Sequence, residues 1–514
     1  MYRIFNLTTM STKDDFIKTI TDGYTAKGDS ITLGAAMLDG EPIGEAHVKI
    51  PLKTLNRHGL IAGATGTGKT KTIQVLSEQL SGFGIPVLMM DIKGDFSGIA
   101  KPGTELPFIT ERHTKINIPY KELGYPVELL TLSEQNGVRL RATISEFGPV
   151  LFSRILDLND VQAGVMSVIF KYCDDNKMAL VDLKDIKKVL NYITEEGKAE
   201  IEEGYGRIST STTGIILRKI LELEQQGADL FFGEMSFDVN DLMRIDENGY
   251  GYVNIIRLTD IQDKPKLFST FMLSLLAEIY EQMPEQGDAG QPELVIFIDE
   301  AHLIFNQASS ALLNQIENII KLIRSKGIGV YFVTQNPMDV PTGVLAQLGL
   351  KIQHALRAFT ANDRKAIKMT AENYPISEFY KTDELITSLG IGEALVTALS
   401  EKGTPTPLAA TMMRAPQSRM DVLTSSEIDE INAKSKLVRK YSEIIDRESA
   451  YEMLNKKISD TGAANAQAQQ RQDEQKQSQK PTDFSPVAKS AIKVLTSATF
   501  IRGAFSILNK MFKK

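Results

Sequence analysis

The chain has 514 residues, of which 42% are hydrophobic and 24% charged, and this composition is ordinary for a folded globular protein. Its length suffices for one large α/β domain with insertions, or for two to three smaller domains. The net charge of -7 argues against a protein that coats nucleic acid with a broad basic surface, although a motor that grips phosphates through a few lysines would remain compatible with it.

Neither a membrane span nor an export signal is visible along the chain. No apolar run approaches the ~18 residues of a bilayer-crossing helix, and residues 1–18 lack the basic start, apolar middle and cleavage site of a secretory signal. The one cysteine, Cys173, stands in an apolar stretch, so we expect it to fill the core. We therefore expect a soluble, cytoplasmic protein.

The first part of the chain predicts strands and then a strand-helix-strand unit. Residues 1–56 contain short alternating segments, at 31–33 and 47–50, that predict a small β-rich region. Next come an apolar strand, a glycine-rich loop, a helix that ends near Leu80 and a second apolar strand at 86–91. A unit of this length predicts a parallel sheet that is covered on both faces.

The middle of the chain predicts helices inserted into an α/β core. Between 145 and 249, apolar residues recur three and four positions apart, as in 161–172, so we predict a helical insertion there. Bare apolar strands then return, for example at 294–299. We therefore assign an α/β core to residues 57–144 and 250–415.

Three different patterns follow the core. Thr424 and Glu427 form a capping box that predicts a helix within residues 416–458. Residues 459–486 are rich in Gln and nearly devoid of large apolar groups, which predicts a disordered linker. Residues 487–514 are basic and amphipathic, a pattern that fits a membrane surface, nucleic acid or an acidic partner equally well.

A phosphate-binding loop is the strongest chemical signal. The stretch GATGTGKT at 63–70 matches G-x-x-x-x-G-K-[ST] and lies between a predicted strand and a predicted helix. Its backbone N–H groups and the helix N-terminus would face a β-phosphate. Lys69 would bridge the β- and γ-phosphates, and the Thr70 hydroxyl would bind Mg²⁺, so we expect ATP and Mg²⁺ as cofactors. The predicted contact residues are Gly63, Thr65, Gly66, Thr67, Gly68, Lys69, Thr70 and Lys71.

A P-loop needs a distant carboxylate, and the apolar strand that ends in Asp299 and Glu300 supplies a pair. Asp299 should hold Mg²⁺ through its water shell, and Glu300 should accept the proton of the attacking water. We interpret His302 as a packed helix residue. Gln335 closes the next strand with an amide that suits either a sensor of the γ-phosphate or a buried structural role.

Five motifs together resemble the HerA/FtsK superfamily and, more closely, the bacterial YjgR-like branch of HerA-type ATPases. The resemblance extends from about residue 50 to 415. It implies a RecA-like P-loop NTPase core, a homo-oligomeric ring that is typically a hexamer, and ATP-driven movement along double-stranded DNA. The motifs are GATGTGKT (63–70), MMDIKGD (89–95), FIDEAHLIF (297–305), IRSKGIGVYFVTQNP (323–337) and HALRAFT (354–360).

The resemblance assigns further residues to the site. It matches Gln335 to the polar sensor of the family, and Asp91 to an acidic position near the nucleotide. Arg57 and Arg324 match positions where relatives carry functional arginines, at least one of which would act on the γ-phosphate of a neighbouring subunit. Arg357 is a weaker third candidate.

Three functions are compatible with these residues. The leading hypothesis is a ring ATPase that translocates DNA. A ring ATPase that pumps or remodels protein is the first alternative, and the acidic charge of the chain favours it. The second alternative is a nucleotide-dependent interaction protein, but Glu300 argues against it because a scaffold needs no general base.

Overall fold

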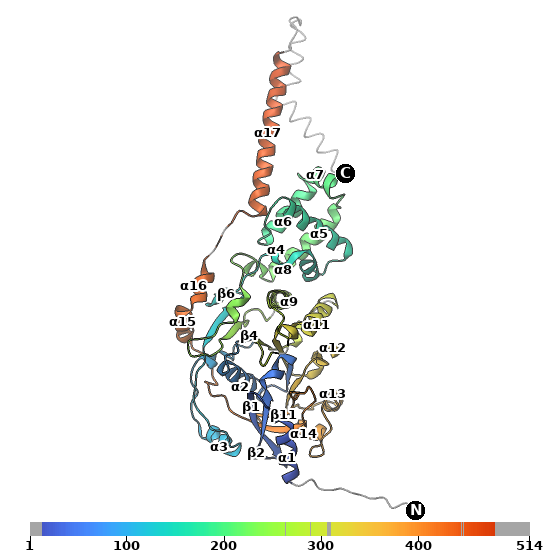
Figure 1. The fold of residues 1–514 in the computed structure, drawn as a ribbon. Coiled ribbons are helices and arrows are strands. Elements are labelled where there is room, and N and C mark those ends of the chain that lie inside the picture. The colour runs from blue at the N-terminus through green and yellow to red at the C-terminus, as the bar shows by residue number, and fades with distance from the viewer. Residues whose placement is uncertain are drawn as a thin grey trace, which may run out of the picture. The chain divides into compact units, whose positions relative to one another are not determined.

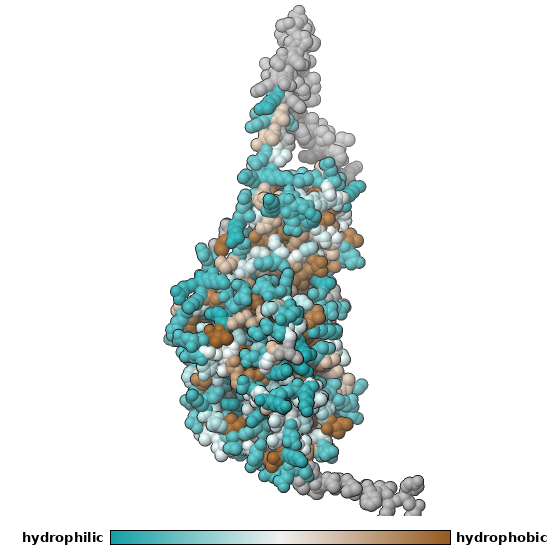
Figure 2. Space-filling view, viewed as in Figure 1, coloured by the Kyte–Doolittle hydropathy of each residue, from teal (hydrophilic) through white to brown (hydrophobic). Residues whose placement is uncertain are grey.

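The computed structural model describes residues 13–478 except 263, 288, 306–309, 444 and 446. The chain divides into two compact units, Met1–Tyr451 and Glu452–Lys514. Hydrophilic side chains cover most of the visible face, where hydrophobic ones are scattered (Figure 2). No helix among the described residues is long and apolar enough to cross a bilayer.

A sheet forms the centre of the first unit, and twelve strands belong to it in the described part of the chain. The strands are β1 (Ser30–Leu38), β2 (Glu41–Pro51), β3 (Gly59–Ala62), β4 (Val87–Asp91), β5 (Val127–Thr131), β6 (Val138–Arg139), β7 (Val253–Arg257), β8 (Leu294–Ile298), β9 (Ile328–Thr334), β10 (Leu350–His354), β11 (Glu393–Thr397) and β12 (Ala409–Met413). Their order is β2-β1-β12-β11-β10-β3-β9-β8-β4-β7-β5-β6.

Most of the sheet is parallel, as the sequence predicts. Every neighbouring pair from β10 to β6 is parallel, whereas β2, β1, β12, β11 and β10 pair in antiparallel fashion. The central strands β4, β8 and β9 are buried along their whole length. Continuous apolar strands of this kind need helices on both faces. The observed fold is therefore the predicted α/β fold.

The N-terminal region differs from the expectation of a small β-rich segment at 1–56. Its described part begins with a helix, α1 (Lys13–Gly23), which buries Phe16 and Ile20. Strand β1 pairs with β12 as well as with β2, so both N-terminal strands extend the main sheet. The helix is short and its apolar face consists of few residues, which explains why periodicity missed it.

Helices flank the sheet and connect its strands (Figure 1). Those around the core are α2 (Lys69–Gly82), α3 (Pro107–Lys115), α9 (Pro265–Gln282), α10 (His302–Phe305), α11 (Ser310–Ile323), α12 (Thr342–Leu345), α13 (Ala361–Ala371) and α14 (Thr382–Ser388). Short 3-10 turns are η1 (Leu52–Arg57), η2 (Ser97–Ala100), η3 (Ala228–Leu230), η4 (Val239–Leu242), η5 (Arg324–Lys326) and η6 (Pro337–Asp339).

Five α-helices lie between β6 and β7 in the described chain, and they gather at one end of the first unit (green in Figure 1). Capping boxes at Thr143, Asn159 and Asp182 start three of them, each satisfying backbone N–H groups of the first turn. Cys173 is buried in this group, as expected. The helices are α4 (Ile144–Ile155), α5 (Asp160–Asp175), α6 (Leu183–Thr194), α7 (Lys198–Gly204) and α8 (Thr210–Gln225).

The region 416–458 holds more than the one helix predicted: α15 (Ser425–Lys434), α16 (Lys436–Ser442) and the start of α17 (Ala450–Ser478). The predicted capping box of Thr424 and Glu427 does begin α15. Ser435 then interrupts the helix with an extended backbone, and its hydroxyl accepts hydrogen bonds from the N–H groups of Leu437 and Val438 at the start of α16.

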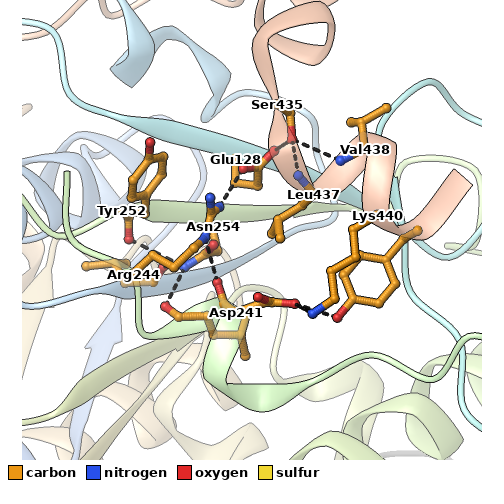
Figure 3. A network of polar contacts seen from close by, with 12 residues as sticks. Glu128, Asp241, Arg244, Tyr252, Asn254, Ser435, Leu437, Val438 and Lys440 are labelled. Atoms are coloured by element: carbon orange, nitrogen blue, oxygen red, sulfur yellow. Dashed lines mark hydrogen bonds and ion pairs between the residues drawn. The ribbon is translucent and has the colours of Figure 1, made fainter. Parts of the chain in front are cut away.

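A polar network explains the interruption at Ser435 (Figure 3). The Ser435 hydroxyl donates to the buried carboxylate of Glu128 on β5, which is also ion-paired with Arg244. Arg244 in turn lies 4.3 Å from the ring centroid of Tyr252. Because a buried carboxylate needs partners, these contacts outweigh the continuation of one long helix. They attach α15 and α16 to the end of the sheet that holds β5 and β6.

The second unit is described as far as Ser478 and contains the rest of α17. Residues 459–478 are therefore helical, and the prediction of a disordered linker is wrong for them. Ala, Gln, Glu and Lys are good helix formers, and a solvated helix satisfies its own backbone without a core. The remainder of that segment and the basic segment 487–514 lie outside the described residues.

Candidate functional site

The P-loop, 63–70, follows β3 and runs into the start of α2. Gly63, Gly66 and Gly68 have φ angles of 153°, 77° and 118°, which residues with a side chain rarely adopt. At Gly63 a Cβ would also lie 2.5 Å from the Cβ of His354. The glycines are thus required for the loop to turn tightly enough to expose successive N–H groups.

Lys69 bends back over its own loop. Its ammonium donates hydrogen bonds to the carbonyl oxygens of Gly63 at 2.6 Å and Ala64 at 3.2 Å. Burial lowers the pKa of Lys69, and the charge of Lys93 lowers it further. A cation is therefore held at the mouth of the loop, where it can meet an anion.

His354 packs against the P-loop at Gly63. The sequence indicated it only as part of the HALRAFT motif. The carbonyl of Glu393 can only accept, so Nδ1 carries the proton in their 2.9 Å contact. Nε2 then accepts from the Thr72 hydroxyl at 2.9 Å. Burial lowers the pKa of His354 to about 4, which keeps the ring neutral. It thereby ties α2 to β10 and β11.

Four adjacent parallel strands, β3-β9-β8-β4, end at the same edge of the sheet. The P-loop follows β3 and Gln335 follows β9. Asp299 and Glu300 follow β8, and Asp91 ends β4. This topology brings the predicted P-loop, sensor and carboxylates to one edge.

The carboxylate pair is almost fully buried. Asp299 accepts a 2.9 Å hydrogen bond from the Glu300 N–H, and burial raises the pKa of Asp299 to about 6. Glu300 has a φ of 47°, a left-handed conformation that turns its side chain sharply away from the strand. The Glu300 carboxylate is ion-paired with Lys93 and lies 3.1 Å from Nδ1 of His302. His302, interpreted from the sequence as a packed helix residue, thus also contacts the Glu300 carboxylate.

Asp91 braces the loop that follows β4. Its carboxylate accepts hydrogen bonds from the N–H groups of Gly94 at 2.7 Å and Phe96 at 3.2 Å. Burial and the nearby charge of Asp95 raise the pKa of Asp91 to about 7. Within the described structure, the residue expected to lie near a nucleotide is thus engaged with its own loop.

The same loop carries two side chains that the sequence reasoning left without a role. Asp95 accepts a 3.2 Å hydrogen bond from the Thr70 hydroxyl, and Lys93 pairs with Glu300. Both residues belong to the MMDIKGD motif. Their short distance from Asp91 in the sequence is a signal that the loop after β4 could reach the P-loop. The strand order is needed to show that it does.

Other predicted contact residues point in different directions. Gln335 is exposed, so a buried structural amide is excluded, and the preceding Thr334 carbonyl accepts from the Gly63 N–H at 3.3 Å. Thr65 is exposed at the tip of the P-loop, whereas the Thr67 hydroxyl donates to the Ala64 carbonyl at 2.7 Å.

Lys71 faces a segment that leads toward α15. Its ammonium donates to the carbonyl of Met420. Two further side chains of α2 bind the same segment: Gln74 donates to the Ser418 hydroxyl at 2.6 Å, and Glu78 accepts from the Ser418 N–H at 2.9 Å. The helix that begins at the P-loop is therefore attached to the chain that leaves the core.

The predicted arginines lie away from the P-loop. Arg57 precedes β3 and Arg324 precedes β9, so both lie at the amino ends of strands whose carboxyl ends bear the site. They line one surface cavity of about 380 Å³. Arg357 is exposed and donates to the Thr387 carbonyl at 3.2 Å. The structure does not bring Arg57 or Arg324 to the P-loop of their own chain.

A mainly parallel sheet with a P-loop and a carboxylate pair at neighbouring strand ends defines the P-loop NTPase class with a RecA-like core. Residues 37–504 match the family described as Helicase HerA-like C-terminal. The chain belongs to this family, which confirms the HerA resemblance.

Individual relatives are more distant. The chain is 23% identical over 363 residues to the DNA double-strand break repair helicase HerA of Sulfolobus acidocaldarius, covering 70% of this chain and 66% of that protein. It is 23% identical over 353 residues to the DNA import protein CedB of the same organism, covering 68% of this chain and 51% of CedB. The matched region is thus less than two thirds of either relative.

Solved structures show the same fold. The bacterial conjugative coupling protein TrwBdeltaN70 superposes with a TM-score of 0.51 at 14% identity, covering 79% of this chain and 94% of the solved chain. A second TrwB structure, in complex with the non-hydrolysable GTP analogue GDPNP, also has a TM-score of 0.51, at 13% identity. At these identities the likeness concerns the fold alone.

The raised pKa of Asp91 predicts a pH-dependent stability. Between about pH 4 and 7 the unfolded chain loses this proton while the folded chain retains it, so the free energy of unfolding should fall as pH rises. The contribution is roughly 4 kcal/mol for a pKa moved from 3.8 to about 7. Asp91→Asn should flatten the profile, measured by urea unfolding at pH 4.5 and 7.5. The exposed Asp22→Asn is the control, and parallel wild-type and Asp91→Asn profiles would refute the assignment.

Proposed function

We propose that the protein is a HerA-type ATPase that binds ATP and Mg²⁺ at the P-loop and hydrolyses the terminal phosphate. One observation carries the proposal: the parallel order β3-β9-β8-β4 gathers a lysine-bearing P-loop, an exposed amide and a buried carboxylate pair at one edge. Membership of the helicase HerA-like family supports it. A scaffold protein would need no such convergence.

The residues around Thr70 fit a magnesium ion. The Thr70 hydroxyl and the carboxylates of Asp95 and Asp299 are oxygen donors, which Mg²⁺ prefers. The Thr70 hydroxyl and a carboxylate oxygen of Asp95 lie 3.2 Å apart. Asp299 would hold the ion through water, so its carboxylate must be ionised. A bound ion would neutralise phosphate charge and lower the pKa that burial has raised.

In the proposed reaction, Lys69 exchanges its two carbonyl partners for phosphate oxygens and offsets their charge. The N–H groups of the P-loop orient the β-phosphate. Glu300 takes the proton of the attacking water. Gln335, at the next strand end, contacts the γ-phosphate or the water and reports its presence to β9.

The opposite positions of the P-loop and the arginines favour a ring. A subunit that presents Arg57 and Arg324 at one edge of its sheet and the P-loop at the other can pass an arginine to a neighbour head to tail. Repetition of such a heterologous contact closes a ring when the rotation permits, and a hexamer is the size we propose. An arginine that meets the neighbour's γ-phosphate would stabilise the charge of the transition state.

We propose double-stranded DNA as the substrate that the ring moves. The names of the relatives favour it, since one is a DNA repair helicase and another a DNA import protein. Movement of protein is the second candidate, and the net charge of -7 favours it because an acidic surface repels DNA. In either case residues 487–514 offer a basic handle for a partner or a membrane surface.

Variants of the P-loop and the carboxylate pair test the chemistry. Lys69→Ala should weaken nucleotide binding and abolish turnover, because it removes charge that offsets the phosphates. Glu300→Gln should bind ATP and lose about 10²–10⁴-fold in turnover, the usual contribution of a general base. Phosphate release and binding of a fluorescent ATP analogue measure the two effects, with the exposed Glu430→Gln as control. Turnover above about a tenth of wild type in Glu300→Gln would refute its assignment.

Mixed assemblies test the arginines. Subunits with Lys69→Ala and subunits with Arg324→Ala should each be inactive, but a mixture should recover part of the ATPase activity, because some interfaces regain an intact P-loop and an intact arginine. Phosphate release is measured against mixing ratio, and co-assembly is checked by differential tagging. Absence of recovery in assemblies that contain both subunits would exclude Arg324, and the same experiment with Arg57→Ala would follow.

Stimulation by DNA separates the two substrates. If the ring translocates DNA, duplex of any sequence should raise the ATPase rate, since backbone contacts do not read bases. The stimulation should fade between roughly 50 and 200 mM salt, with a shallow slope if few phosphates are neutralised. A variant that lacks residues 487–514 separates binding by this segment from binding by the core. An assembled, active protein that ignores all DNA at low salt would favour protein as the substrate.

A further inference from the structure

We propose that Lys93 is a positioning residue that pairs with Glu300 until the terminal phosphate of ATP draws it away. This inference rests on the proposed ATPase function and deepens it. Lys93 would thereby make the release of the general base depend on a third phosphate, which ADP lacks.

The two partners of the ion pair between Lys93 and Glu300 differ in how deeply they are buried. The side chain of Glu300 is 8% exposed, whereas that of Lys93 is 36% exposed. The described groups that face the Glu300 carboxylate are the ammonium of Lys93 and Nδ1 of His302. Lys93, by contrast, is partly exposed, and the carboxylates of Asp299 and Asp95 also act on its charge.

The backbone that carries Lys93 is held from several sides. The Asp91 carboxylate binds the N–H groups of Gly94 and Phe96, and the Gln262 amide donates to the Ile92 carbonyl at 2.6 Å. Gly94 has a φ of 76°, which a residue with a side chain rarely adopts. Because the loop is braced, exchange of partners falls to the flexible four-carbon stem of Lys93.

Two ammonium groups approach the same place from two strands. Lys69 comes from the P-loop after β3, and Lys93 comes from the loop after β4. The charge of Lys93 reaches Lys69, whose pKa it lowers second to burial. Two like charges held this close favour an anion with several charges between them. A terminal phosphate beside Lys69 would fulfil this requirement.

Exchange of partners would change what Glu300 can reach. While Lys93 is paired with Glu300, the carboxylate is held against the loop that follows β4. When Lys93 moves to the γ-phosphate, Glu300 is released toward the attacking water, with Nδ1 of His302 at 3.1 Å as its remaining neighbour. After phosphate departs, Lys93 returns and Glu300 is again restrained.

A double-mutant cycle tests the exchange in the full-length protein. Dissociation constants for ADP and a non-hydrolysable ATP analogue are measured for wild type, Lys93→Met, Glu300→Gln and the double variant. Lys93→Met should weaken binding of the ATP analogue about tenfold and leave ADP within about twofold, since only the γ-phosphate meets Lys93. Glu300→Gln should bind the analogue more tightly, because it no longer competes for Lys93, and this gain should vanish in the double variant.

Two further variants test whether the effect of Lys93→Met comes only from removing a positive charge or from disturbing the fold. Lys101→Met removes a lysine of the same 36% exposure, paired with Glu430, and should leave both dissociation constants unchanged. Lys93→Arg keeps the charge and should restore most of the preference for the ATP analogue over ADP.

Other results would overturn the inference. If Lys93→Met weakens binding of both nucleotides equally or of neither, Lys93 does not exchange partners. The same holds if the gain of Glu300→Gln persists without Lys93. Wild-type protein that binds both nucleotides but hydrolyses none would refute the proposed ATPase while the cycle still reports on Lys93. Wild-type protein that binds neither would overturn both.

Discussion

The site depends on the parallel pairing of β3, β9, β8 and β4. The loops that carry the candidate site residues follow these strands at their carboxyl ends. Four segments far apart in sequence must therefore meet at one edge. The same constraint sends Arg57 and Arg324 to the opposite edge. One topological feature therefore accounts both for the convergence of the predicted phosphate-binding residues and for their separation from the arginines within a single chain.

Buried polar groups give this edge its rigidity. Neutral His354 joins the helix after the P-loop to β10 and β11, and Asp91 holds the loop after β4 through two backbone N–H groups. Unpaired, each group would be costly in the interior. Such contacts leave only long side chains free to rearrange, notably Lys69 and Lys93, whose present partners are groups that a phosphate can replace.

The P-loop helix is also attached to the C-terminal region. Glu78 and Gln74 of α2 bind the segment at 417–420, which continues into α15. Beyond Ser435, the network around Glu128 fixes α16 to the sheet edge (Figure 3). Hydrogen bonds thus attach the P-loop helix to the chain that leads into α15, and a second group of them attaches α16 to the sheet.

The sequence by itself determined the class of the protein and most of its candidate chemistry. The P-loop and the acidic pair are local patterns whose meaning follows from the strand before them, so the α/β fold and residues such as Lys69 and Glu300 were accessible. Other features required the tertiary structure. The contacts of Lys93, Asp95 and His302, and the helix break at Ser435, involve partners distant in sequence or positioned by one backbone conformation. Local periodicity carries no information about which strand lies beside which, and that order decides these contacts.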